Sequence, residues 1–192
     1  MLILIAGLVL FFGPHFFTAI RSRTDGEDLR AKNEAAYMAG YSLISLAGFV
    51  LIIYGYGLTR GAGVLYVPPV GLQHLNLLLM IPAMVLLVAS QIPAGYLKRA
   101  SKHPMLVAVK LWAVGHLLAN GELNSVILFG SFLIFAVFDR IMVKRRGDVG
   151  GGAVGEVSVI WDVVAAVVGL GAYLAFLFWL HPILFGVYVL PA

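Results

Sequence analysis

Six long runs of apolar residues, separated by short polar segments, occupy most of this chain of 192 residues. A helix that crosses a bilayer needs roughly 20 mainly apolar residues, because each residue advances about 1.5 Å and the hydrocarbon layer is about 30 Å thick. None of the runs alternates apolar and polar residues as a membrane β-strand does. We therefore predict an all-α membrane bundle of six transmembrane helices, over residues 2–20, 38–58, 72–95, 104–120, 123–143 and 158–181.

The basic residues predict how these helices are oriented, because they gather in alternate connections. Eleven of the 13 Lys and Arg residues follow the first, third and fifth runs: Arg21, Arg23, Arg30 and Lys32; Lys98, Arg99 and Lys102; Arg140, Lys144, Arg145 and Arg146. Connections rich in Lys and Arg remain in the cytoplasm. This rule predicts that both termini lie on the non-cytoplasmic side.

The composition narrows the class of protein further. With 61% apolar and 11% charged residues, we expect an integral membrane protein of one domain, residues 1–192, whose main partner is the lipid bilayer. The net charge of +4 lies beside the spans, which argues against nucleic-acid binding. The absence of cysteine excludes disulfides, thiolate metal sites and cysteine nucleophiles. Five glycines in residues 147–156 predict a flexible cytoplasmic loop.

Small residues in two of the predicted spans indicate close helix packing. They lie in "AGYSLISLAG", residues 39–48, and in "GLGAYLA", residues 169–175. Membrane helices approach each other most closely where side chains are small. We expect a structural role for both segments.

Ionisable residues inside the predicted spans or at their boundaries fall at two depths. His15, His103, Lys110, Asp139 and Asp162 lie toward the cytoplasmic side, and His74 and His116 lie toward the outer side. His181 ends the last span and is interpreted as an ordinary interfacial residue. An ionisable group at mid-helix costs at least about 2.5–3.5 kcal/mol, so function is the first hypothesis for such groups.

Histidines of different helices share a depth at each of these two levels. This predicts a haem or metal site, because membrane helices hold haem between imidazoles on facing helices. Lys110, Arg140 or Arg21 would then lie near the propionates. Thirteen residues, or about 220° of rotation, separate His103 from His116, so these two cannot serve one site. The residues leave open which histidine pair is used. They also allow purely structural roles. Lys110 would then pair with Asp139 or Asp162 or extend to the interface, Asp139 would pair with Arg140, and the histidines would be interfacial.

The run "HPMLVAVKLWAVGHLLANGELNSVILFGSFLIFAVFDR", which begins at His103, resembles the signature of the NnrU family, and the resemblance extends over roughly residues 1–146. It implies a multi-pass protein of the bacterial inner membrane, associated with denitrification and nitric oxide metabolism. The family also contains the plant 15-cis-zeta-carotene isomerase, a haem b protein. By this similarity His15 and His103 are the expected haem ligands, and isomerase-like redox chemistry on an apolar small molecule is the expected reaction type.

Two other functions compete with this interpretation. The string "KHPML" is similar to the Arg-His-Pro-x-Tyr-x-Gly string of membrane methyltransferases that use S-adenosylmethionine, although the tyrosine and glycine are missing here. A non-catalytic assembly factor for a partner reductase also fits a denitrification role. Whether the protein is an enzyme is therefore left open by the sequence.

Overall fold

The computed structural model describes residues 1–21, 33–153 and 155–190. Over these ranges the regular structure is helical apart from one isolated β-bridge, which confirms the all-α prediction. The chain divides into two compact units: Met1–Val67 with Asn120–Asp148, and Pro68–Ala119 with Val149–Ala192. Arg23, Arg30 and Lys32, three of the basic residues that predict orientation, lie outside the described residues.

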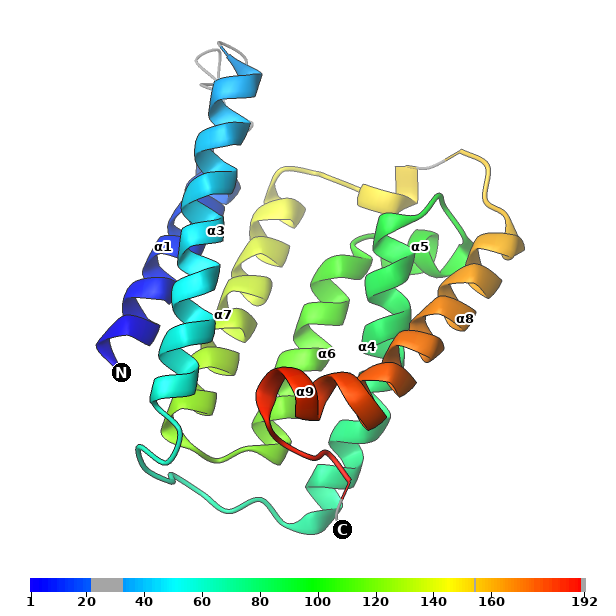
Figure 1. Ribbon diagram of the computed structural model, residues 1–192. Helices are drawn as coiled ribbons and strands as arrows, with labels where there is room; N and C mark the ends of the chain where they lie inside the picture. The colour runs from blue at the N-terminus through cyan, green and yellow to red at the C-terminus, as the bar shows by residue number, and fades with distance from the viewer. Residues whose placement is uncertain (22–32, 154, 191–192) are drawn as a thin grey trace. The chain divides into compact units, whose positions relative to one another are not determined.

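Three helices form the first unit (Figure 1): α1 (Leu2–Arg21), α3 (Glu34–Leu58) and α7 (Leu123–Arg145). Helices α1 and α7 run in the same direction, and α3 runs opposite to both. Helix α3 begins four residues before the predicted span, because the Asn33 side chain caps it by accepting the Ala36 N–H at 3.0 Å.

Three glycines bring α1 and α3 into backbone contact. A β-carbon on Gly7 would lie 2.6 Å from the Ile52 nitrogen, and one on Gly55 would lie 2.7 Å from the Leu4 Cα. Gly48 is equally close to the backbone of Phe11, with 2.8 Å to its Cα. Larger side chains do not fit here, so the prediction of close packing in residues 39–48 is confirmed for Gly48.

Contacts at each end of the first unit fix which connections lie together. At one end, the connection after α3 pairs with the segment before α7: Leu65 N–H donates to the Gly121 carbonyl at 2.8 Å, and Leu123 N–H donates to the Gly63 carbonyl at 2.9 Å. The Tyr66 hydroxyl donates to the Asn120 carbonyl in the same place, and burial raises the pKa of this phenol. At the other end, the Arg146 guanidinium donates to the Ala19 carbonyl. The end of α3 therefore lies beside the start of α7, and the end of α1 beside the end of α7.

The second unit is built around α4 (Val70–Gln91), which packs against α6 (Pro104–Ala119) and α8 (Val159–Ala175) (Figure 1). Helix α4 ends four residues before the predicted limit of 95, because Ile92 precedes Pro93 and is extended (φ −105°, ψ 169°). A short helix that the sequence did not predict, α5 (Tyr96–Ser101), leads to α6. A π-helical turn, η2 (Phe176–Leu180), joins α8 to α9 (His181–Phe185).

Part of the glycine-rich segment 147–156 is ordered against the second unit. Gly150–Ala153 forms the 3-10 turn η1, which packs on α5, and the Gly151 N–H donates to the Lys102 carbonyl at 2.6 Å. The positive φ of Gly150 (51°) favours glycine at this position. Residues 150–153 thus form a defined turn in this structure, and the flexibility of segment 147–156 stays a prediction.

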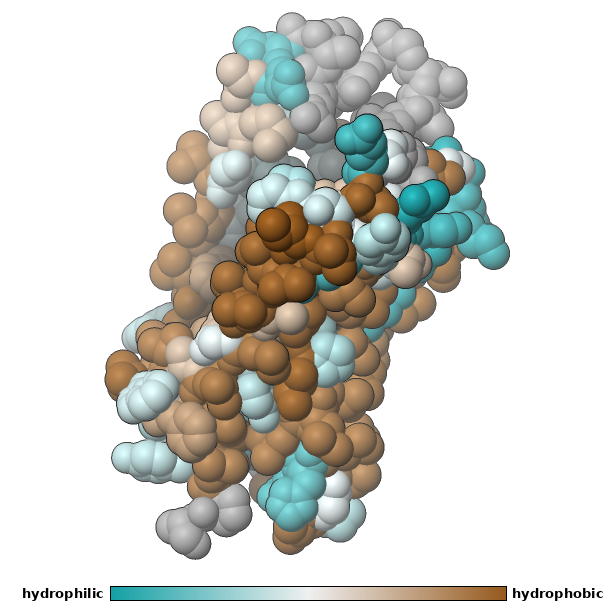
Figure 2. Space-filling model, turned by 90° about the vertical axis from the view of Figure 1, so that its right-hand side faces the viewer, coloured by the Kyte–Doolittle hydropathy of each residue, from teal (hydrophilic) through white to brown (hydrophobic). Residues whose placement is uncertain are grey.

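Five helices among the described residues are long and apolar enough to cross a membrane: Leu2–Ile20, Glu34–Leu58, Val70–Gln91, Leu123–Arg145 and Val159–Phe185. Helix α6 is apolar but has only 16 residues, or about 24 Å. Apolar side chains cover most of the face that Figure 2 shows. A surface of this kind suits a hydrocarbon environment and supports the prediction of a membrane protein.

We predict that Gly48→Ala destabilises the first unit, because the added carbon overlaps the Phe11 backbone and forces α1 away from α3. Overpacking of this kind costs about 1–3 kcal/mol. Gly57→Ala on the same helix is the matched control, since a β-carbon there meets nothing within 4 Å. Thermal unfolding in detergent should show a lower midpoint for Gly48→Ala only; equal midpoints would contradict the close contact.

Candidate functional site

His15 on α1 is held by its own helix. Its Nδ1 donates to the Phe11 carbonyl at 2.6 Å, since a carbonyl oxygen only accepts. In the neutral imidazole the Nε2 lone pair is then left for another partner. Among the described residues, Nε2 of His15 makes no hydrogen bond. Metal-ligating histidines commonly donate their second nitrogen to a carbonyl in this way.

Aromatic rings from all three helices of the first unit surround His15. The Phe11 ring stacks on the imidazole with 4.4 Å between centroids, Tyr41 lies at 5.0 Å and Phe135 meets it edge-on at 5.6 Å. The charge of Asp139 on α7 acts on both His15 and Tyr41, so these groups lie near one level. This agrees with the common depth that the sequence predicts for His15 and Asp139.

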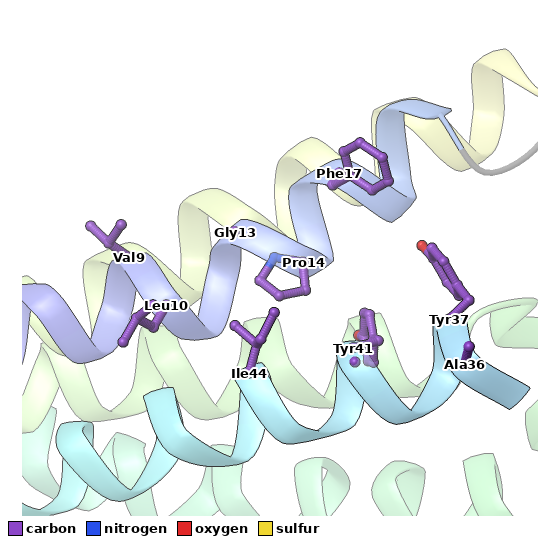
Figure 3. Close-up of a pocket in the computed structure, with 10 residues that line it drawn as sticks. Val9, Leu10, Gly13, Pro14, Phe17, Ala36, Tyr37, Tyr41 and Ile44 are labelled. Atoms are coloured by element: carbon purple, nitrogen blue, oxygen red, sulfur yellow. The ribbon is translucent and has the colours of Figure 1, made fainter. Parts of the chain in front are cut away.

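A groove of about 490 Å³ lies between α1 and α3 and is open along one side. Figure 3 shows the side chains of both helices along its walls. Its lining is Val9, Leu10, Gly13, Pro14 and Phe17 from α1, and Ala36, Tyr37, Gly40, Tyr41 and Ile44 from α3. Tyr41 belongs both to this lining and to the rings around His15, so one side chain separates the groove from the imidazole.

His103 belongs to the second unit, at the start of α6. Its ring is covered by η1: a β-carbon on Gly150 would lie 2.5 Å from the His103 Cε1 and 2.8 Å from its Nδ1. Glycine at 150 is therefore required for the segment to lie against the ring. His15 and His103 occur in different units, and the structure describes each unit by itself.

Asp162 and Lys98 both cap helix ends. The Asp162 carboxylate accepts the Tyr96 N–H at 2.8 Å and the Leu97 N–H at 3.0 Å, at the start of α5. The Lys98 ammonium donates to the Ser90 and Ile92 carbonyls, at the end of α4. These are the charge signs that stabilise a helix start and a helix end, respectively. The hydrogen bonds of Asp162 therefore favour a structural role over pairing with Lys110.

The alternative pair, His74 and His116, lies in the second unit on packed helices. The Asn76 side chain on α4 lies against Gly115 on α6, which puts His74 and His116 at similar heights, as predicted. Two residues along a helix turn its face by about 200°, however, so His74 points away from the side that meets α6. His74 is accordingly exposed.

His116 instead lies near His181, which the sequence did not single out. The His116 Nδ1 donates to the Trp112 carbonyl at 2.8 Å, and His181 is close enough to act on it electrostatically. The π-helical turn η2 immediately precedes His181. Pro182, which has no N–H to donate, is the only hint of this irregularity in the sequence.

The remaining predicted site residues are distributed over both units. Lys110 is partly buried on α6, and Arg140 is partly buried on α7 next to Asp139; Arg21 ends α1. Over residues 1–21, 33–153 and 155–190, no three His, Asp or Glu side chains gather as ligands for a metal ion. An axial haem pair needs only two imidazoles, so this leaves the haem prediction untested.

Comparison with known proteins gives one match. Residues 3–189 match the family described as NnrU protein. No curated protein and no solved structure matches the chain.

We predict that Asp162→Ala destabilises the second unit by about 1–2 kcal/mol, because two N–H groups at the start of α5 lose their acceptor. Glu156→Ala is the control, since Glu156 is an exposed acidic residue six positions earlier, in the connection that leads into α8. Chemical denaturation followed by tryptophan fluorescence measures both variants. If Asp162→Ala unfolds at the same denaturant concentration as Glu156→Ala, the carboxylate does not cap α5.

Proposed function

This chain belongs to the NnrU family, and we propose that it is a bacterial inner-membrane protein that binds haem b through His15 and His103. The observation that carries the proposal is the geometry of His15. Its Nδ1 is fixed on the Phe11 carbonyl, and its Nε2 makes no hydrogen bond within the described residues. A partly buried imidazole with this tautomer has its Nε2 lone pair available to bind iron.

The surroundings of His15 fit a haem ligand in two further respects. The rings of Phe11, Tyr41 and Phe135 pack around the imidazole and cover part of it. The Asp139 carboxylate is near enough to stabilise positive charge that develops at the imidazole. Haem iron supplies one-electron and Lewis-acid chemistry when it is bound.

His103 is the second ligand in this proposal. The close cover by Gly150 supports a fixed position for the His103 ring. Lys110 follows His103 by seven residues and shares its helical face, so its ammonium is the partner assigned to a propionate. Arg140, one residue beyond Asp139, is the corresponding cation of the first unit.

The family resemblance supports a role in nitrogen-oxide metabolism. Isomerase-like redox chemistry on an apolar molecule is the reaction type that suits a site in a membrane. The protein's own residues would bind and orient such a molecule and keep water away. Tyr41 stands between the α1–α3 groove and His15, so it is the side chain expected to face both a groove occupant and the haem site.

Six spans are part of the proposal, with α6 as the sixth. The Val64–Glu122 bridge ties the end of α3 to the start of α7, so both lie on one side of the membrane. Between them the chain passes through α4, which is long enough to cross. The chain must return to the starting side before α7, and α6 is the helix available for this. The positive-inside rule then assigns both termini to the outer side.

We predict that His15→Ala and His103→Ala each remove the low-spin signal of the haem-loaded protein, because each removes one of the two imidazoles that would hold the iron. Optical and paramagnetic resonance spectra after haem-replete expression measure this, with size-exclusion elution as the check of folding. His74→Ala and His116→Ala test the alternative pair in the same way. A folded His15→Ala protein with the unchanged low-spin spectrum would contradict the assignment.

The topology has a separate test that exploits the absence of native cysteine. We expect an impermeant maleimide added outside the inner membrane to label Val67→Cys but neither Arg99→Cys nor Lys144→Cys. All three positions are exposed, so accessibility differs only by side. If α6 did not cross, α7 would run outward and Lys144→Cys would be labelled together with Val67→Cys.

A further inference from the structure

We propose that the groove between α1 and α3 is a binding site for one acyl chain of a membrane phospholipid. Its ten lining residues come from the apolar helices Leu2–Ile20 and Glu34–Leu58, both long enough to cross a membrane, so the groove lies at the depth of the hydrocarbon layer. Nearly all of the exposed lining is apolar. A hollow of this kind in a bilayer is filled by a hydrocarbon chain in preference to water.

Two glycines make the hollow. Gly13 on α1 and Gly40 on α3 both line the groove, and a β-carbon on either one would meet nothing within 4 Å. This contrasts with Gly7 and Gly48 on the same two helices, where the backbones touch. Helices α1 and α3 are therefore in contact at Gly7 and Gly48 and leave space between them at Gly13 and Gly40.

The groove is elongated along α1. Its α1 lining runs from Val9 to Phe17, a rise of about 12 Å. This length and the apolar lining suit an extended hydrocarbon chain.

A polar pair at one end of the groove selects an amphiphile over a plain hydrocarbon. The Tyr37 hydroxyl, on a lining residue, forms a 2.6 Å hydrogen bond with the Thr18 hydroxyl. Two hydroxyls that share one hydrogen bond retain one further donor hydrogen. In the proposal, that hydrogen is the donor for an ester carbonyl or phosphate oxygen of the lipid, at the end of the groove where α1 finishes.

The probe for this site is a phosphatidylglycerol that carries a diazirine in one acyl chain, added to the full-length protein in nanodiscs. After irradiation, peptide mass spectrometry should find the label concentrated on groove residues such as Gly13 and Ile44. Gly40→Leu, which fills the hollow, should lower that labelling by about 10-fold. Gly57→Leu is the matched control, because a side chain there also meets nothing within 4 Å but lies outside the lining.

A second pair of variants tests the polar end. Tyr37→Phe keeps the ring and removes the hydroxyl, and we expect about 5-fold weaker labelling by the phospholipid probe. Tyr54→Phe, an exposed tyrosine on the same helix, should leave the labelling unchanged. A diazirine-bearing alkane should label both variants as it labels the native protein.

Three results would overturn the proposal. Labelling spread evenly over the apolar surfaces of all helices would mean ordinary lipid contact, and labelling that Gly40→Leu does not reduce would place the chain elsewhere. Cross-links from Ile44 to a second copy would mean that the groove is an interface between chains. None of these readouts involves haem, so the lipid site and the haem proposal succeed or fail separately.

Discussion

The close contact of α1 with α3 is the constraint from which the site in the first unit follows. Gly7, Gly48 and Gly55 allow the two backbones to touch, and that contact fixes the rotation of α1. Lipid tails are as apolar as the helices, so van der Waals contact between close backbones, and not the hydrophobic effect, holds membrane helices together. With α1 fixed in this way, His15 faces Tyr41 and Phe135, and Gly13 faces the open groove.

Several ionisable side chains form hydrogen bonds within the protein, as a hydrocarbon environment favours. His15 and His116 each donate Nδ1–H to a carbonyl four residues earlier, and His181 donates to the Val187 carbonyl. Asp162 and Lys98 bind the ends of helices. The cost of placing these groups in a membrane is thus met largely by local hydrogen bonds. His15 differs from Asp162 because its Nε2 makes no hydrogen bond among the described residues.

The sequence predicts the fold class, the existence of all six helices and the shared depth of His15 and Asp139, because apolar length and a rise per residue determine them. It does not predict how each helix is rotated about its own axis. Gly40 and Gly48 belong to one small-residue segment, yet Gly48 touches Phe11 and Gly40 lines the groove, since eight residues turn a helix by about 80°. Depth alone also paired His74 with His116, whereas the rotation of α4 leaves His74 exposed. Tertiary contacts decide both cases.

The central claim is that the Nε2 of His15, freed by the Nδ1 bond to Phe11, binds the haem iron. The most direct test is a His15→Gly protein, expressed with haem and titrated with imidazole while its resonance spectrum is recorded. The space left by the ring should admit free imidazole, so we expect the low-spin signal to be lost in His15→Gly and restored by added imidazole. A signal that persists without imidazole, or that imidazole does not restore in the folded protein, would contradict the claim.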